Sequence, residues 1–181
     1  EFFYRPLPFG DNTWSYMTDA DGMILEFMQE ANADTSQDYI KLLHVGHTVT
    51  DMDKAIDFFE NTMGFKMVMK PELETDEMEA KGLGYLELQN VTSATAMFEM
   101  PSGQIIEALY YEYPKISDVT PTPLNYVGKH HVAYEVENME EAHAELKKAG
   151  CEPLYKPLDD GNVCWEYMKN FEGTVFELTQ E

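Results

Sequence analysis

Two stretches of the chain alternate apolar and polar positions in the same order. In residues 43–50, every second residue is apolar or aromatic, and the residues between them are small or polar. Residues 131–136 repeat the alternation, and His131 takes the place of His44. This period of two is typical of a strand with one buried face. We therefore predict two equivalent strands, each with an apolar face and an open polar face.

An amphipathic pattern follows each of these strands. Residues 51–63 begin with an acidic residue and repeat apolar side chains at helical spacing until Gly64. Residues 138–149 begin with Asn138, repeat apolar side chains at the same spacing and stop at Gly150. The spacing predicts one helix in each stretch, with its apolar side packed on the preceding sheet. Both helices are expected to end at the glycines, which accept left-handed backbone angles.

Each helix is followed by further strand patterns. The first set covers residues 65–69, 84–89, 94–100 and 104–111, with a turn at 101–103, and the second covers 152–156, 163–169 and the residues from 174 onward. The order predicts an α+β fold of two βαβββ modules, residues 40–113 and 127–181. Residues 114–126, which hold three prolines, form the predicted connector.

The first thirty residues repeat the last thirty. Residues 1–30 align without a gap on residues 152–181, with twelve identical positions, and Glu26 falls on Glu177. Residues 1–30 are therefore predicted to be the orphan C-terminal half of a further module, joined by a linker at 31–39. They belong to a longer tandem protein, add to a sheet of another copy, or fold back on their own chain. Glu26 is predicted to supply no metal ligand within its own chain.

The charge of the chain limits its partners. Twelve basic and thirty-four acidic residues give a net charge of −22, which repels nucleic acid and anionic membranes and attracts divalent cations. No apolar run reaches the roughly 20 residues of a membrane-spanning helix. Cys151 and Cys164 are too few for a disulfide framework. The chain starts with Glu1 and shows no apolar signal segment, so we expect a processed or excised soluble protein of the cytoplasm.

Several of these segments resemble a known family. The chain resembles the vicinal oxygen chelate superfamily in four places. They are the opening Leu42-Leu43-His44-Val45-Gly46, Glu107, His131 and the closing stretch 173–178. Members of this superfamily include glyoxalase I, bleomycin and fosfomycin resistance proteins, methylmalonyl-CoA epimerase and extradiol dioxygenases. The resemblance extends from Tyr39 to the end of the chain. It implies that the paired modules curve into a half-barrel, with the helices on the outer face.

The resemblance also implies a metal site. In this superfamily the first and last strands of each module direct ligands to one metal ion, which implies the ligands His44, Glu107, His131 and Glu177. This set is similar to the two histidines and two glutamates of bacterial glyoxalase I. A single histidine of this kind is better explained as a hydrogen-bonded core residue. Two histidines and two glutamates at equivalent positions of the two repeats favour a divalent metal. Ni, Co, Zn, Mn and Fe(II) all suit these ligands.

The implied chemistry is that of a glyoxalase-type lyase or isomerase. The metal would bind two adjacent oxygens of a small substrate and stabilise an enolate-like charge. The resemblance makes Glu177 the first candidate for the catalytic base and Glu107 its counterpart. The resemblance implies that members which use glutathione carry an arginine four residues after the first ligand. This chain has Thr48 at that position. This difference argues against glutathione as a co-substrate.

Two other functions stay open on the sequence alone. An Fe(II) extradiol-type dioxygenase needs two histidines and one carboxylate. A metal-free binding protein similar to bleomycin resistance proteins would hold a flat ligand between aromatic residues such as Trp165 and Tyr167. His143 is expected to be solvated on its helix, and His47 to be structural or exposed. We expect a small-molecule substrate and a homodimer, with strand exchange through residues 1–30 as one way to form it.

Overall fold

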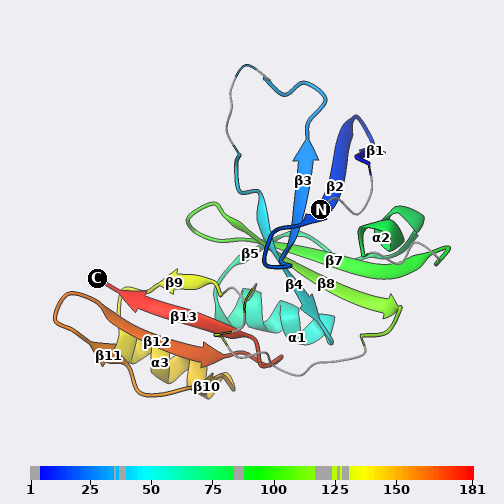
Figure 1. Ribbon diagram of the computed structural model, residues 1–181. Coiled ribbons are helices and arrows are strands. Elements are labelled where there is room, and N and C mark those ends of the chain that lie inside the picture. The colour runs from blue at the N-terminus through cyan, green and yellow to red at the C-terminus, as the bar shows by residue number, and fades with distance from the viewer. Residues whose placement is uncertain are drawn as a thin grey trace.

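The computed structural model describes residues 5–34, 36, 40–83, 88–116, 124, 125, 127 and 131–181. These residues form a three-stranded sheet and two five-stranded sheets (Figure 1). The small N-terminal sheet has the order β1-β2-β3 and consists of β1 (Leu7–Phe9), β2 (Asn12–Thr18) and β3 (Ile24–Gln29). Strands β2 and β3 form an antiparallel hairpin, which we call the N-terminal hairpin.

The second sheet contains the strands of the first module. They are β4 (His44–Val49), β5 (Lys66–Met69), β6 (Leu73–Asp76), β7 (Val91–Glu99) and β8 (Ile105–Tyr113). The order is β4-β8-β7-β5, with β6 also paired to β7. Strand β4 runs parallel to β8, and the other pairs are antiparallel. The first and last strands of the module are therefore neighbours.

The third sheet repeats this arrangement in the second module. Its strands are β9 (Ala133–Glu135), β10 (Glu152–Pro153), β11 (Leu158–Asp159), β12 (Cys164–Lys169) and β13 (Val175–Gln180). The order is β10-β12-β13-β9, and β9 is parallel to β13 as β4 is to β8. The predicted α+β fold of paired βαβββ-like modules with mixed sheets is confirmed.

The two predicted amphipathic helices are present, each with a side-chain cap. Asp51 accepts a hydrogen bond from the Lys54 backbone N–H at 3.1 Å at the start of α1 (Met52–Ile56). Asn138 does the same for the Glu141 N–H at 3.2 Å before α3 (Met139–Lys148). Such caps satisfy backbone donors that the first turn leaves without partners. The first helix differs from the prediction in its second half, which continues as the π-helical segment η1 (Asp57–Thr62).

One apolar cluster joins the two modules. Phe58 of η1 lies 5.7 Å from the ring of Phe171 and 6.2 Å from that of Phe176, both in the second module. The rings of Phe65 and Tyr134 are 5.8 Å apart. The cluster also buries residues of both sheets, including Phe98, Ile106, Met168 and Leu178. Because these residues occupy the apolar faces of their strands, the polar faces that carry the predicted ligands point away from the core.

The segment between β5 and β7 contains two elements that the sequence did not predict. Strand β6 is followed by the short helix α2 (Glu77–Gly82), capped by Asp76. Six residues are too few to show a helical period, which explains why the pattern missed α2. The predicted strand at 84–89 and the predicted connector at 114–126 lie largely outside the described residues. No helix in the described part of the chain is long and apolar enough to cross a membrane.

Candidate metal centre

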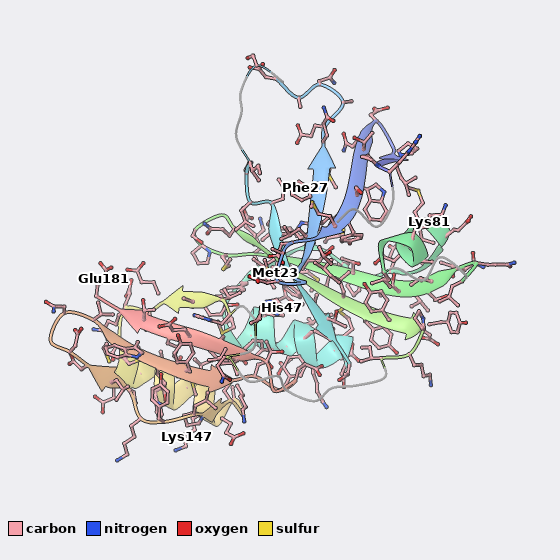
Figure 2. All side chains as sticks on the ribbon, in the orientation of Figure 1. Met23, Phe27, His47, Lys81, Lys147 and Glu181 are labelled. Carbon is pink, nitrogen blue, oxygen red and sulfur yellow. The ribbon has the colours of Figure 1, made fainter. Side chains whose placement is uncertain are left out.

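Three strands bring Glu26, His44 and Glu107 together. The parallel pairing of β4 with β8 places Gly46 opposite Glu107, so that His44 and Glu107 lie on the same polar side of the sheet. The other side of β8 is fully buried at Ile106 and Ala108. Glu26 comes from β3 of the N-terminal hairpin. In Figure 2 the hairpin can be found by the label of Phe27 and strand β4 by that of His47.

The three side chains lie within coordination distance of one another. His44 Nε2 is 3.2 Å from Glu26 Oε2 and 3.4 Å from Glu107 Oε2. One ligand atom from each residue lies within 4.8 Å of the other two. The side chains of Glu26, His44 and Glu107 are only 22%, 18% and 12% exposed. The three side chains are therefore mostly buried, but solvent still reaches each of them.

The pKa values of Glu107 and His44, the two residues that the first module contributes to the cluster, are both shifted. Burial raises the pKa of Glu107 to about 7, an effect that the nearby His44 opposes and Glu26 and Glu79 strengthen. The hydrogen bond with Glu26 raises the pKa of His44, although burial acts in the other direction. Carboxylates gathered in a poorly hydrated place repel each other, and a cation among them removes that cost. A divalent metal and a protonated His44 would both supply the positive charge.

A second layer of polar groups surrounds the three residues. Tyr16 donates a hydrogen bond to Glu26 Oε2 at 3.5 Å. Tyr111 donates one at 3.0 Å to Glu79 Oε1, on helix α2. Burial raises the pKa of Tyr16, Glu79 and Tyr111, and the neighbouring carboxylates raise each of them further. The phenols therefore stay protonated and act as hydrogen-bond donors to the acidic groups.

Helix α2 also holds the N-terminal hairpin in place. A Cβ atom at Gly82 would lie 2.3 Å and 2.4 Å from ring carbons of Tyr16 and 3.1 Å from Cη2 of Trp14. Separations under 3 Å cannot be accommodated without movement, so only glycine permits this contact. Trp14 is correspondingly buried, with 6% of its surface exposed. The packing of the hairpin on α2 therefore fixes the position of Glu26.

Substituting Gly82→Ala is expected to weaken this packing. The added methyl group clashes with the Tyr16 ring, and overpacking of this kind costs about 1–3 kcal/mol. The hairpin should shift away from α2, and hydrogen exchange should become faster in residues 12–29. Lys81→Ala, on the same helix, is the control because its ion pair with Glu77 lies at the surface. Equal exchange rates in the Gly82→Ala protein and the native protein would contradict the assigned role of this glycine.

The other predicted ligands form a separate pair. His131 Nε2 lies 2.9 Å from Glu177 Oε2 and 3.4 Å from the hydroxyl of Tyr167. Within the described residues, these two side chains do not join the cluster of three around His44. A pocket between β4 and the second module is lined by residues of both, among them Gly46, Thr48 and His131. One centre shared by all four predicted ligands stays a prediction.

The structure corrects two expectations from the sequence. Glu26 was expected to lie outside any metal site of its own chain, but it lies beside His44 and Glu107, two of the predicted ligands, because the hairpin docks on the polar face of the first module. His143 is not solvated: its Nδ1 lies 2.8 Å and 2.9 Å from the two oxygens of Glu166, whose side chain is fully buried. His47 packs its ring against Phe59 at 6.2 Å, as expected of a structural residue.

Sequence reasoning missed part of this site. The alignment of Glu26 with Glu177 was a signal that it could be a ligand, but the absence of a histidine strand upstream argued against it. Tyr16 could have been found in the same way, since it aligns with Tyr167. Nothing in the sequence indicated that Glu79 lies near the site, because the short acidic segment around it has the composition of an exposed surface segment.

Comparison with known proteins identifies the family. A model of the glyoxalase/bleomycin resistance protein/dioxygenase superfamily matches residues 41–177. The chain belongs to this superfamily. The match covers most of both modules, and the glyoxalase superfamily is the vicinal oxygen chelate family that the sequence resembles. No curated protein matches the chain.

Solved structures with the same fold include several members of the superfamily. A glyoxalase family protein from Bacillus cereus is 25% identical, with a TM-score of 0.71 over 82% of this chain and 99% of that protein. The fosfomycin resistance protein FosX from Listeria monocytogenes is 17% identical, with a TM-score of 0.51 over 78% of this chain and 92% of FosX, in a crystal with Mn(II) and sulfate. A glyoxalase family protein from Enterococcus faecalis is 18% identical, with a TM-score of 0.51 over 77% and 96%. These similarities agree on the fold and do not identify glyoxalase I itself.

Proposed function

We propose that this member of the glyoxalase superfamily is a divalent-metal-dependent enzyme whose centre includes Glu26, His44 and Glu107. The observation that carries the proposal is the convergence of one imidazole and two carboxylates within 4.8 Å. Each of these side chains is mostly withdrawn from water, where like charges are costly. A bound cation would turn that repulsion into attraction.

The ligand types narrow the choice of metal. Imidazole together with carboxylate suits Mn, Fe, Co, Ni and Zn, and is less typical of Ca or Mg, which prefer oxygen ligands. FosX has the same fold and has been crystallised with Mn(II). Manganese is therefore the first metal to test in this protein.

The proposed reaction is of the glyoxalase lyase or isomerase type, on a small substrate with two adjacent oxygens. When bound, the metal would act as a Lewis acid on those oxygens. Glu107 is the proposed proton acceptor, because its carboxylate lies 3.4 Å from His44 and its burial favours the protonated form once it has taken a proton. Glu177 would take that role in a centre to which the second module contributes. Tyr16 would orient Glu26 through its hydrogen bond.

The alternatives fit these contacts less well. An extradiol-type dioxygenase would require two histidines and one carboxylate, whereas this cluster has one histidine and two carboxylates. A metal-free binding protein has no need for acidic side chains gathered in a poorly hydrated place. Thr48 supplies no positive charge for an anionic thiol adduct, and the net charge of −22 also disfavours one. We therefore propose an uncharged or weakly charged substrate.

Element analysis and turnover assays test this proposal. The protein is stripped with a chelator, loaded separately with Mn²⁺, Co²⁺, Ni²⁺, Zn²⁺ and, without oxygen, Fe²⁺, and then dialysed. Each form is then assayed with hemithioacetals of methylglyoxal, made from neutral and anionic thiols, and with catechol in the presence of oxygen. We expect metal retention through dialysis and metal-dependent turnover of a neutral hemithioacetal. Failure to retain any of the five metals would overturn the proposal, and turnover of catechol alone would favour the dioxygenase.

A further inference from the structure

A second apolar cluster fastens helix α2 to the side of the first module that carries His44 and Glu107, which we call the ligand side. The cluster buries Ala80 of α2, Val91 of β7 and Tyr111 of β8. Tyr111 lies four residues after Glu107, on the same side of β8, because side chains alternate along a strand. Helix α2 covers it so closely that only 8% of its surface is exposed. The helix is therefore packed on the ligand side, next to the metal centre.

One polar contact crosses this cluster. The hydroxyl of Tyr111 donates a hydrogen bond at 3.0 Å to Glu79 Oε1 on α2. Burial raises the pKa of Glu79, and the hydrogen bond from Tyr111 acts against that rise, whereas Glu26 and Asp76 add to it. A carboxylate in such a place is drawn towards water, and a hydrogen bond from a phenol compensates for the water that it loses. The bond thus fixes which side of α2 faces β8.

The same helix carries the contact that places Glu26. Gly82 lies three residues after Glu79, nearly one helical turn further along α2. Its lack of a side chain admits the ring of Tyr16 from the N-terminal hairpin. Tyr16 in turn donates its hydrogen bond to Glu26, which belongs to the first centre. A continuous series of contacts therefore runs from Tyr111 through α2 and the hairpin to the metal centre, and α2 lies between the two in Figure 1.

We propose that Glu79 is a positioning residue for the metal centre: its hydrogen bond with Tyr111 holds α2 against β8, and α2 holds Glu26 where it can bind the metal. Glu79 and Tyr111 do not touch the metal themselves, since they act through the packing of Gly82 on Tyr16. Loss of the bond releases α2, and the hairpin moves with it. This inference rests on the proposed function, in which Glu26 is a metal ligand.

Glutamine at position 79 separates positioning from a simple effect of charge. The carboxylate of Glu79 also adds negative charge near the centre, and the pKa of Glu107, which burial raises, is raised further by Glu79. A glutamine side chain keeps an oxygen that accepts the bond from Tyr111, but it carries no charge. Positioning requires Glu79→Gln to behave like the native chain, whereas a role through charge alone requires it to behave like Glu79→Ala.

Isothermal titration of the stripped full chain with Mn²⁺ provides the first test. Glu79→Ala and Tyr111→Phe should each lower the affinity about tenfold, which is the lower end for groups that orient metal ligands. The double variant should lose no more than either single variant, because both substitutions break the same bond. Glu79→Gln should stay within about threefold of the native affinity. Glu77→Ala is the matched control, since it removes a carboxylate of the same helix that is 67% exposed.

Trp14 reports the position of the hairpin without any metal. It is 6% exposed, and its Cη2 would lie 3.1 Å from a Cβ atom at Gly82. The chain has two tryptophans, so Trp165→Phe leaves Trp14 as the single fluorophore of its kind. In that background, acrylamide should quench the fluorescence of stripped Glu79→Ala at least twice as efficiently as that of the unsubstituted position or of Glu79→Gln.

The contrary results differ for the two proposals. Mn²⁺ binding by the native chain with the same affinity in Glu79→Ala would refute the positioning role and leave the proposed function standing. Glu79→Gln that binds as weakly as Glu79→Ala would replace positioning by a charge effect, and additive losses in the double variant would show that the two residues act separately. Unchanged quenching of Trp14 in Glu79→Ala would show that α2 does not place the hairpin. A native chain that binds no metal would refute the proposed function, and the positioning role with it.

Discussion

Replacing His44 with alanine is expected to lower the metal affinity of the first centre by more than about 100-fold. Loss of groups that merely orient metal ligands commonly costs 10- to 100-fold, and His44 is a proposed ligand itself. It is also the group that lies between Glu26 and Glu107, at 3.2 Å and 3.4 Å. Without it, two carboxylates remain that repel each other. Isothermal titration of the stripped protein with Mn²⁺ measures the change.

Thr48→Ala is the matched control for this substitution. Thr48 lies on the same strand and the same polar side as His44, is exposed, and is not a proposed ligand. Its replacement should leave the affinity for Mn²⁺ within about threefold of the native value, a difference below 1 kcal/mol. If His44→Ala binds Mn²⁺ as tightly as Thr48→Ala, then the cluster is held together by a protonated imidazole and has no role in metal binding.

The alternation of residues along the strands was enough to predict the modules. A period of two identified the polar face of each strand, and the family resemblance implied which residues on those faces are ligands. The parallel pairing of β4 with β8, which brings His44 and Glu107 onto neighbouring strands, is given by the structure. The structure likewise brings His131 next to Glu177. These are contacts within one module, which local patterns determine well.

Contacts between modules could not be predicted in this way. The sequence shows that residues 1–30 copy residues 152–181, but it does not show which sheet the copy covers. That choice depends on Gly82, where the absence of a side chain admits the rings of Tyr16 and Trp14. A glycine in a short helix has no pattern that marks it as a docking site. For this reason the sequence pattern did not place Glu26 next to His44 and Glu107, where the structure has it.

The stability of the metal-free protein is expected to decrease as the pH rises from 5 to 8. The pKa of Glu107 is 4.5 in its ordinary state and about 7 in the folded protein, so the folded state holds more protons between these values. The free energy of unfolding then falls as pH rises, by about 2–3 kcal/mol from Glu107. The raised pKa of His44 acts in the same direction, because its stabilising effect is present at low pH and is lost as pH rises through the folded value.

Urea unfolding in the presence of a chelator, at pH 5 and at pH 8, measures this decrease. Glu107→Gln is the informative variant, because its side chain has a similar shape but does not ionise. Its free energy of unfolding should change less between the two pH values than that of the native chain, by about 2–3 kcal/mol. Adding Mn²⁺ to the native protein should also reduce the decrease, since a cation stabilises the ionised carboxylates. If the native chain and Glu107→Gln show the same pH dependence, then Glu107 ionises in the folded protein as readily as in water, and the repulsion that we expect a metal to relieve is absent.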